Sequence, residues 1–485
     1  MIIIAEAISQ EQVTDSAGNK LYVAKELSPT SPKHISITKI LESSPVSYFL
    51  KVGQYLAHYL KIESPLVFVT DWSDPTELAG LRLETDSTTI DYPDLCFLAF
   101  HTNWDDIAAS GIENIFAHEF SHMWLSWLRF DFKLSLSNKF HTSTAITDFY
   151  MAFSEGFAEC LEIITKDLTG YKLEDGELWD YGYDGNAWLC ARDSQLRYHA
   201  VKNNRFIYQT ALPYPEDFDT YVNLHIAHIT STAFTPERLK NGSQILASEG
   251  AVASIFYQIY AHELFKNTFE HKNSVGDNLS PTEKNKFYSA FGIENPQNLD
   301  PICNLLLKIV YALSKIDLTQ PTLMTDFIRA YGECFPDEKA ELYNVFTKTT
   351  HFATASNEAK NIFGEIYRIG RRGNISALQD IFKVRNELVV NLRARLLDGS
   401  LALNAAVYDE IWITGDKEIP PTPWQPNIKV PYRFNINTAT VADLLSINGV
   451  SLDIAEKLVQ LREEQGGFTS LADYEKLLQD LTPSA

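Results

Sequence analysis

The spacing of apolar positions divides the chain into a region of short apolar runs and a longer region with helical periodicity. Up to about residue 102, apolar or alternating runs stand between turn residues, a pattern that predicts strands. We expect strands at Ile35–Ile40, Leu66–Thr70, Leu81–Thr85 and Leu95–His101, with a helix at about Tyr48–Leu60 between them. From residue 105 to about residue 265, apolar residues recur at helical spacing. The predicted class is therefore α+β, a small strand-rich N-terminal lobe followed by a mainly helical lobe.

Helical periodicity continues through the second half of the chain and then stops. Further helices are predicted at Cys303–Leu313, Leu323–Tyr331, Asp337–Phe346 and Ile375–Leu397. Five prolines follow between residues 420 and 431, which excludes a helix there and favours an extended linker. We therefore expect an all-α module after this linker. The predicted division is residues 1–104 (strand-rich lobe), 105–270 (helical region with the candidate chemistry), 271–415 (helical C-terminal lobe), 416–432 (linker) and 433–480 (terminal module).

Composition and charge indicate what kind of protein this is and which functions are unfavourable for it. With 45% hydrophobic and 21% charged residues, the 485-residue chain has the profile of a globular protein. Its net charge of -22 argues against a surface that grips nucleic acid throughout, because phosphate binding needs clustered cations. Five cysteines without close pairs suggest neither a disulfide framework nor a cysteine zinc site. No apolar run approaches the ~20 residues of a membrane span and no secretory signal is apparent, so we expect no membrane partner and a cytoplasmic location.

The chemistry is concentrated in a His-Glu-x-x-His pattern formed by His118, Glu119 and His122. Apolar neighbours at helical spacing predict a buried helix over this segment. Residues four apart share one face of a helix, so the two imidazoles can bind one zinc ion while Glu119 reaches the water on the metal. The alternative is that both histidines are ordinary core side chains.

A catalytic zinc ion needs a third protein ligand and one open position. Thirty-three residues after His122, Glu155 stands in the run Ser-Glu-Gly-Phe-Ala, on a helix predicted to begin near Thr147 or Asp148. Glu159 and Glu162 lie four and seven residues further on, hence on the same helix face. Either could accept a hydrogen bond from the free nitrogen of a ligating histidine, or both could belong to a solvated acidic face.

His-Glu-x-x-His followed by a Glu-Gly-Phe-Ala helix resembles the gluzincin metallopeptidases, in particular the aminopeptidase N and glycyl aminopeptidase branches. The resemblance implies a zinc cofactor and makes Glu155 the third ligand. The rival is Glu249, although its segment resembles a later helix of that family that carries no ligand. On that later helix the family has a tyrosine that donates to the oxyanion, and Ala247 replaces it here. A Gly-Ala-Met-Glu-Asn segment, which would bind a free amino terminus, is absent from the sequence, so aminopeptidase specificity is not predicted.

Other residues must then supply the oxyanion donor. His225 and His228 are the histidines available in the same region, together with three tyrosines. The tyrosines are Tyr221, Tyr257 and Tyr260. The alternative for each histidine is again a core position.

The resemblance therefore implies zinc-dependent hydrolysis of peptide bonds in peptides or proteins, in which Glu119 takes a proton from the water and passes it to the leaving amine. Two alternatives stay open. One is a catalytically weak or inactive scaffold that docks a partner through the terminal module, and the other is a protease acting on DNA-associated proteins.

The terminal residues contain Asn-Ile-Asn-Thr-Ala at Asn435–Ala439 and Ile-Asn-Gly-Val at Ile447–Val450. They resemble the helix-hairpin-helix domain of the competence-protein type, which implies backbone N–H groups offered to a DNA phosphate. Here Ser451 replaces the second hairpin glycine, and residues 433–485 hold four basic against eight acidic residues, a net charge of -4. We therefore favour a structural role or a protein partner for residues 433–480, with DNA as the disfavoured alternative. A basic cluster could contact nucleic acid or an acidic partner, or could be an ordinary solvated helix face; it comprises Arg368, Arg371, Arg372, Lys383, Arg385, Arg393 and Arg395.

Overall fold

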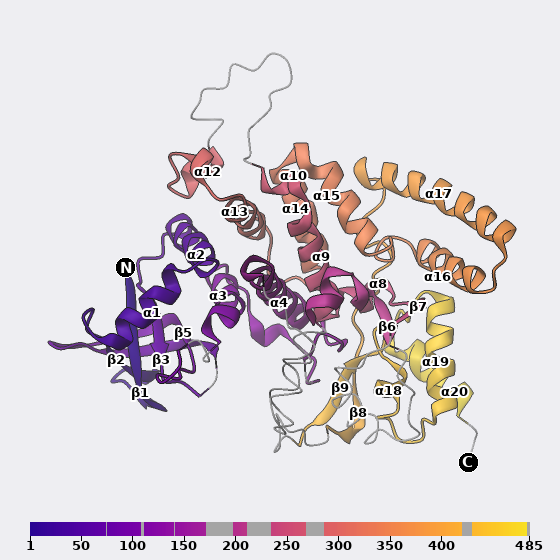
Figure 1. Cartoon of the computed structure of the whole chain (residues 1–485). Coiled ribbons are helices and arrows are strands. Elements are labelled where there is room, and N and C mark those ends of the chain that lie inside the picture. Colours follow the sequence, from indigo (N-terminus) through magenta and orange to yellow (C-terminus); the bar gives the residue numbers. More distant parts are fainter. Residues whose placement is uncertain are drawn as a thin grey trace. The chain divides into compact units, whose positions relative to one another are not determined.

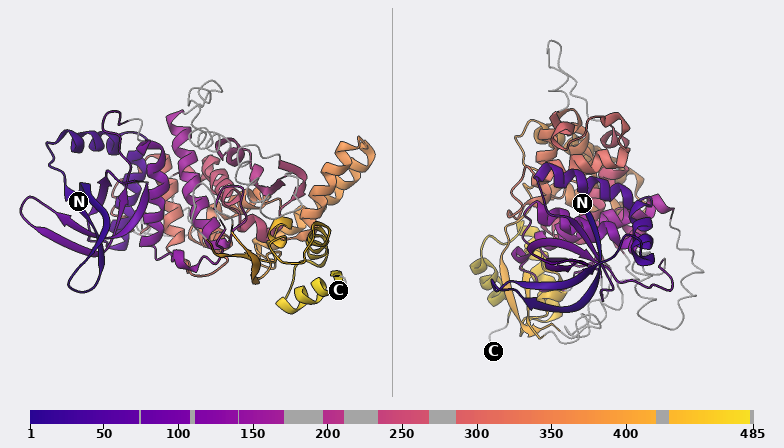
Figure 2. Two further views of the ribbon diagram at one scale, coloured as in Figure 1. Left: turned by 90° about the horizontal axis from the view of Figure 1, so that it is seen from below. Right: turned by 90° about the vertical axis from the view of Figure 1, so that its left-hand side faces the viewer.

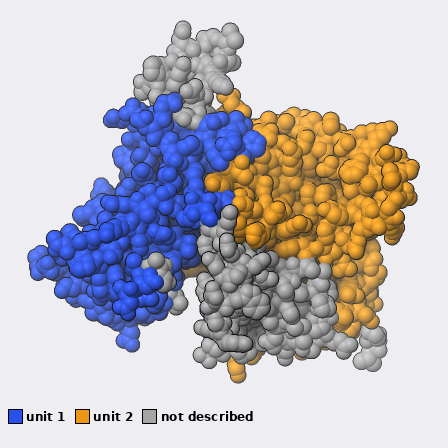
Figure 3. Space-filling model, in the orientation of Figure 1, with its two compact units in different colours: residues 1–131, 157–171, 262–318 blue, residues 132–156, 172–261, 319–485 orange. Residues whose placement is uncertain are grey.

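The structure is a computed structural model that describes residues 1–73, 75–107, 111–139, 141–170, 197–210, 234–267, 286–419 and 429–482. The chain forms two compact units (Figure 3). Unit 1 comprises residues 1–131, 157–171 and 262–318, and unit 2 comprises residues 132–156, 172–261 and 319–485. Each unit combines three separate stretches of the chain. The consecutive domain ranges predicted from the sequence stay a prediction.

Unit 1 contains a closed five-stranded barrel, drawn in indigo and purple in Figure 1. Its strands are β1 (Ile2–Thr14), β2 (Lys20–Glu26), β3 (Leu66–Thr70), β4 (Thr76–Glu84) and β5 (Thr89–Ala99), in the order β1-β2-β4-β5-β3. The pairs β1–β2 and β4–β5 are antiparallel, and the other three pairs are parallel. A shared apolar core comprises Ile3, Ala5, Ala24, Val67, Val69, Trp72, Leu81, Leu83, Leu95, Phe97 and Ala99. The α+β class is confirmed.

One strand prediction is wrong, because residues 35–40 belong to helix α1 (Pro32–Glu42). Two local features start this helix. The Ser31 side chain accepts the N–H of His34, and proline stands in the first turn, where no N–H is needed. The apolar residues of the run then recur at helical spacing, which buries Ile37 and Ile40.

Unit 1 also contains several helices. They are α1, α2 (Val46–Leu60), α3 (Ile112–Trp127), the second half of α4 (Phe149–Thr169), α10 (Glu263–Lys266), α12 (Lys286–Ala290) and α13 (Pro301–Leu313). Helix α3 packs on the barrel through Phe116, whose ring centroid lies 5.7 Å from that of Phe68. Gly53 lets α2 approach α3, because a Cβ there would lie 2.3 Å from Cζ of Phe120. Since Phe116 and Phe120 face inward, positions 118 and 122 project from the other side of α3.

Unit 2 is mostly helical. It contains the two-stranded antiparallel sheet β6 (Tyr208–Thr210) and β7 (Phe234–Leu239), and the helices α8 (Gly242–Leu246), α9 (Glu249–Ala261), α14 (Leu323–Cys334), α15 (Pro336–Thr349), α16 (Asn357–Arg371) and α17 (Ile375–Leu397). The helices predicted between residues 303 and 397 are confirmed, and α17 has the predicted bounds. Among the described residues, no helix is long and apolar enough to cross a bilayer.

The C-terminal part of unit 2 begins with strands β8 (Trp412–Glu418) and β9 (Pro431–Asn435), which pair antiparallel. The predicted linker, residues 416–432, therefore begins within β8 and ends within β9. Its residues 420–428 lie outside the described part of the chain. Helices α18 (Val441–Leu444), α19 (Leu452–Gln465) and α20 (Leu471–Leu481) follow. They share an apolar core with β9 that includes Phe434, Leu458 and Tyr474.

Candidate functional site

Helices α3 and α4 bring the sequence-predicted ligands together. His118 and His122 lie one turn apart on α3 with ring centroids separated by 5.1 Å, and His122 is 9% exposed. Glu155 lies on α4 and is partly buried. One ligand atom from each of these three residues lies within 4.8 Å of the other two. Two imidazoles and a carboxylate match the donor set of catalytic zinc sites, so these residues fit the metal.

The start of α4 fixes where Glu155 lies. The Asp148 carboxylate accepts the N–H of Met151 at 2.8 Å, which makes Asp148 the N-cap, one of the two predicted alternatives. The same carboxylate accepts the Ser135 hydroxyl at 2.6 Å and the N–H of Ser137 at 2.9 Å. Asp148 therefore ties the preceding loop to the helix that carries Glu155.

Glu162 lies behind the first histidine. Its Oε2 is 3.7 Å from Nδ1 of His118, while its Oε1 accepts from Nζ of Lys166 at 2.6 Å. This distance is that of an ion pair rather than of a hydrogen bond, and a carboxylate on that side of the ring favours Nε2 as the ligand atom. Glu159 is fully buried on the same helix. Glu159 and Glu162 were both predicted to support a ligating histidine, and the contact with His118 makes Glu162 the better candidate.

His141 is a neighbour of the site that the sequence analysis missed. Its Nδ1 lies 3.4 Å from Oε2 of Glu249 and 3.9 Å from Oε2 of Glu155, and its side chain is 45% exposed. The hydrogen bond with Glu249, together with the charge of Glu155, raises the pKa of His141 to about 9 against the opposing effect of burial. No local pattern signals this contact, because Glu249 lies more than a hundred residues downstream. Among the described residues, Glu249 is not in the group that could share a metal ion.

The other predicted site residues are the base Glu119 and the candidate oxyanion donors, and the structure describes only some of them. Glu119 is partly buried on α3 beside His118. Tyr257 and Tyr260 lie on α9, are 7% and 8% exposed, and pack with ring centroids 5.6 Å apart. Their role as oxyanion donors stays a prediction. The predicted donors His225, His228 and Tyr221 lie outside the described residues.

A second feature is the hairpin between α18 and α19. The backbone N–H of Asn448 donates to Oδ2 of Asp416 on β8 at 2.7 Å, and the N–H of Asp416 donates to the Ser446 carbonyl at 3.0 Å. Gly415 permits this approach, because a Cβ there would lie 2.2 Å from Oγ of Ser446. A carboxylate of the chain itself therefore accepts a hairpin N–H of the kind that such motifs offer to phosphate.

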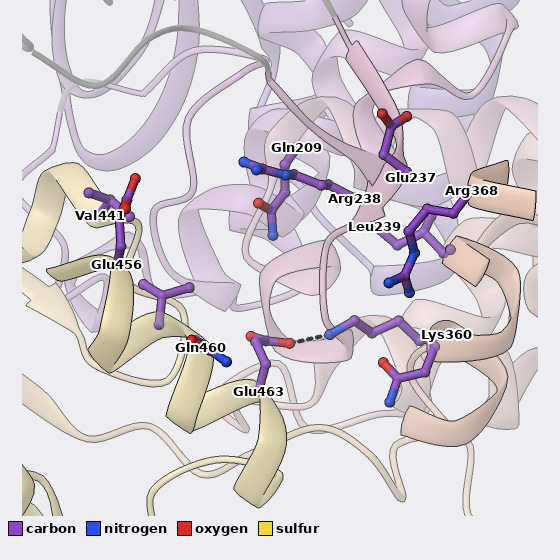
Figure 4. A pocket seen from close by; sticks show the side chains of 13 residues that line it. Gln209, Glu237, Arg238, Leu239, Lys360, Arg368, Val441, Glu456, Gln460 and Glu463 are labelled. Atoms are coloured by element: carbon purple, nitrogen blue, oxygen red, sulfur yellow. Dashed lines mark hydrogen bonds and ion pairs between the residues drawn. The ribbon is translucent and has the colours of Figure 1, made fainter. Parts of the chain in front are cut away.

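Helix α19 is also fastened to the rest of unit 2. Glu463 pairs with Lys360 of α16, accepts from Asn241 at 2.9 Å, and lies 2.9 Å from Nη2 of Arg462. Burial raises the pKa of Glu463, but the charges of Arg462 and Lys360 outweigh burial and bring the pKa to about 2. The Lys360–Glu463 pair borders a pocket of about 420 Å³ that β7, α16 and α19 line (Figure 4).

Comparisons with known proteins identify this terminal region only. A family described as "Helix-hairpin-helix motif" matches residues 432–479, which begin within β9 and end within α20. No curated protein and no solved structure matches the chain. The predicted helix-hairpin-helix region is thus confirmed.

Proposed function

We propose that the chain is a zinc-dependent metallopeptidase of gluzincin type, and that it hydrolyses peptide bonds in peptides or proteins. The observation that carries this proposal is the convergence of His118, His122 and Glu155 within 4.8 Å. Two histidines four apart on one helix and a glutamate from a second helix are the ligand arrangement expected of such an enzyme.

The side chains around this group have separable roles. When bound, zinc would supply Lewis acidity toward a water molecule and a peptide carbonyl. Glu119 accepts a proton from the water and delivers it to the leaving amine. Glu162 orients His118 from behind, and Lys166 holds the second oxygen of that carboxylate.

His141 adds a candidate for the missing oxyanion donor. Its half-exposed imidazole lies beside Glu155, so it can meet both solvent and a substrate near the ligand group. An N–H donor there would stabilise negative charge that develops on the carbonyl oxygen. Replacement of His141 by Ala should therefore lower kcat more than it raises KM.

The test of the proposed activity is Glu119→Gln. The variant should keep its zinc and lose hydrolysis of a fluorogenic peptide mixture by at least ~10²-fold, the lower range for a general base. Glu263→Gln is the matched control, because Glu263 also follows a histidine but Lys266 stands where a second ligand would be, and its side chain is 84% exposed. Loss of zinc in Glu119→Gln, or unchanged turnover, would refute the assignment. Zinc binding without any hydrolysis by the wild-type protein would favour the inactive scaffold.

For the terminal region we propose a structural role within the protein rather than DNA binding through the hairpin. Two observations support it. Asp416 contacts the hairpin, and Glu463 of α19 has three polar partners, Lys360, Asn241 and Arg462. A nucleic-acid partner is the alternative, since helix-hairpin-helix motifs commonly bind DNA.

A further inference from the structure

Helix α17 carries a row of exposed apolar side chains along its whole length. Ile375 is 71% exposed, Phe382 42%, Val390 68% and Leu397 42%. These residues are separated by seven, eight and seven positions, so at about 100° per residue they fall within an arc of about 80°. A different set of apolar residues packs α17 against its own unit, namely Val389, Leu392 and Leu396. Figures 1 and 2 draw α17 at the outer edge of this unit.

The exposed row is symmetric about Asn386. Ile375 and Phe382 precede Asn386 by eleven and four residues, and Val390 and Leu397 follow it by four and eleven. Two copies of α17 that run antiparallel with a two-fold axis at Asn386 would therefore place Ile375 against Leu397 of the partner subunit. Phe382 would meet Val390 of the partner subunit. An interface between identical copies must be complementary to itself, and this row has that property.

Charge at the edge of the row fits the same arrangement. Lys383 and Glu387 are both exposed, lie on the same side of the apolar row, and stand three residues before and one residue after Asn386. Antiparallel pairing about Asn386 brings Lys383 near Glu387 of the partner subunit, and the two-fold axis repeats the pair. Unlike charges thus meet twice across the apolar contact.

We propose that α17 is a homodimerisation surface, at which two copies of the chain associate through an antiparallel α17–α17 contact centred on Asn386. Four apolar side chains from each copy form a small interface, and small interfaces are typical of weak, concentration-dependent complexes. The proposal is independent of the proposed peptidase activity, because α17 carries none of the residues assigned to that site.

The first test compares two valines of α17 by sedimentation velocity of the full-length protein between about 1 and 100 µM, the range in which weak interfaces dissociate. The wild-type protein should form dimers as its concentration rises. Val390→Glu should weaken the dimer by at least ~10-fold, because each dimer then buries two charges. Val384→Glu is the matched control, since Val384 is 50% exposed on the same helix but points about 120° away from Val390. A protein that stays monomeric throughout, or a dimer that both variants weaken equally, overturns the proposal.

The second test fixes the direction of pairing by oxidative cross-linking. Asn386→Cys should form a disulfide-linked dimer, because residue 386 meets its own copy at the axis. Gln379→Cys should not, since seven residues at 1.5 Å per residue put the two copies of residue 379 about 20 Å apart. Lys383→Glu should weaken the dimer and Lys383→Glu with Glu387→Lys should restore it. Cross-linking of both cysteine variants, or no restoration by the charge exchange, contradicts the antiparallel contact.

Discussion

Replacement of Glu463 by Gln removes the charge that joins α19 to the rest of unit 2. In the native protein the Glu463 carboxylate pairs with Lys360 and with Arg462, a guanidinium that is 1% exposed. Arg462 also donates to the carbonyls of Ile436 and Ala439, at 3.0 and 2.6 Å. Glutamine has nearly the same shape but leaves both cations without a carboxylate. Most of the expected loss of stability comes from Arg462, because its guanidinium stays buried without a paired carboxylate.

The pKa of Glu463 sets the size of the expected effect. Its displacement from the ordinary 4.5 to about 2 corresponds to roughly 3 kcal/mol, because one pH unit is worth about 1.4 kcal/mol. Since the side chain is 21% exposed, solvent screening reduces this figure, and we expect a loss of about 2 kcal/mol at pH 7. A depressed carboxyl pKa stabilises the fold above pH 4.5, and this stabilisation disappears as the pH falls through 2. The difference between wild type and variant should therefore shrink below pH 4.5.

Hydrogen exchange of the α19 amides measures this local free energy without requiring the whole chain to unfold in one step. At pH 7, protection in α19 of Glu463→Gln should fall about 30-fold, the equivalent of 2 kcal/mol. Glu456→Gln is the control, because Glu456 is exposed on the same helix. Unchanged protection in Glu463→Gln, or an equal loss in both variants, would refute the electrostatic explanation.

Three further predictions concern the two candidate sites. Glu162→Gln should weaken zinc binding by about 10-fold or more in a chelator competition, because His118 loses the carboxylate behind it, and unchanged affinity would contradict that role. Gly156→Ala should lower zinc occupancy and thermal stability together, since the new Cβ would lie 2.7 Å from the Glu249 carbonyl; a normal zinc content and melting temperature would speak against a close approach there. Asp416→Ala should increase retardation of duplex DNA at low salt by exposing the N–H of Asn448 and removing a negative charge, and no change would show that Asp416 does not block the hairpin.

Local patterns predicted the parts of the fold that local forces decide. Helix α17 and strand β3 have the predicted bounds, because uninterrupted periodicity marks both. The run at residues 35–40 was misleading, since isoleucine, serine and threonine alternate there like a strand, while the Ser31 cap and Pro32 impose a helix. Strands β1 and β2 were missed. Strand β1 is buried only near its start and continues through mostly polar, partly exposed residues, so its sequence has no apolar run of strand length.

In the candidate sites, too, local sequence patterns reveal some residues, whereas others become relevant only through contacts between distant segments. His118 and His122 follow from spacing on one helix, and Glu162 follows from its helix face once α4 is recognised. His141 becomes relevant only when Glu249 is brought beside it in space. The contact of Asp416 with the hairpin likewise joins segments thirty-two residues apart, and only the pairing of β8 with β9 brings them together.

The central claim is that His118, His122 and Glu155 hold one zinc ion, and zinc stoichiometry measured by mass spectrometry tests it most directly. The purified wild-type protein should bind one zinc ion per chain. His122→Ala and Glu155→Gln should lose most of it, whereas Glu249→Gln should retain it. A wild-type protein that binds no more zinc than His122→Ala would contradict the metal site. Loss of zinc from Glu249→Gln with retention in Glu155→Gln would show that the third ligand is wrong.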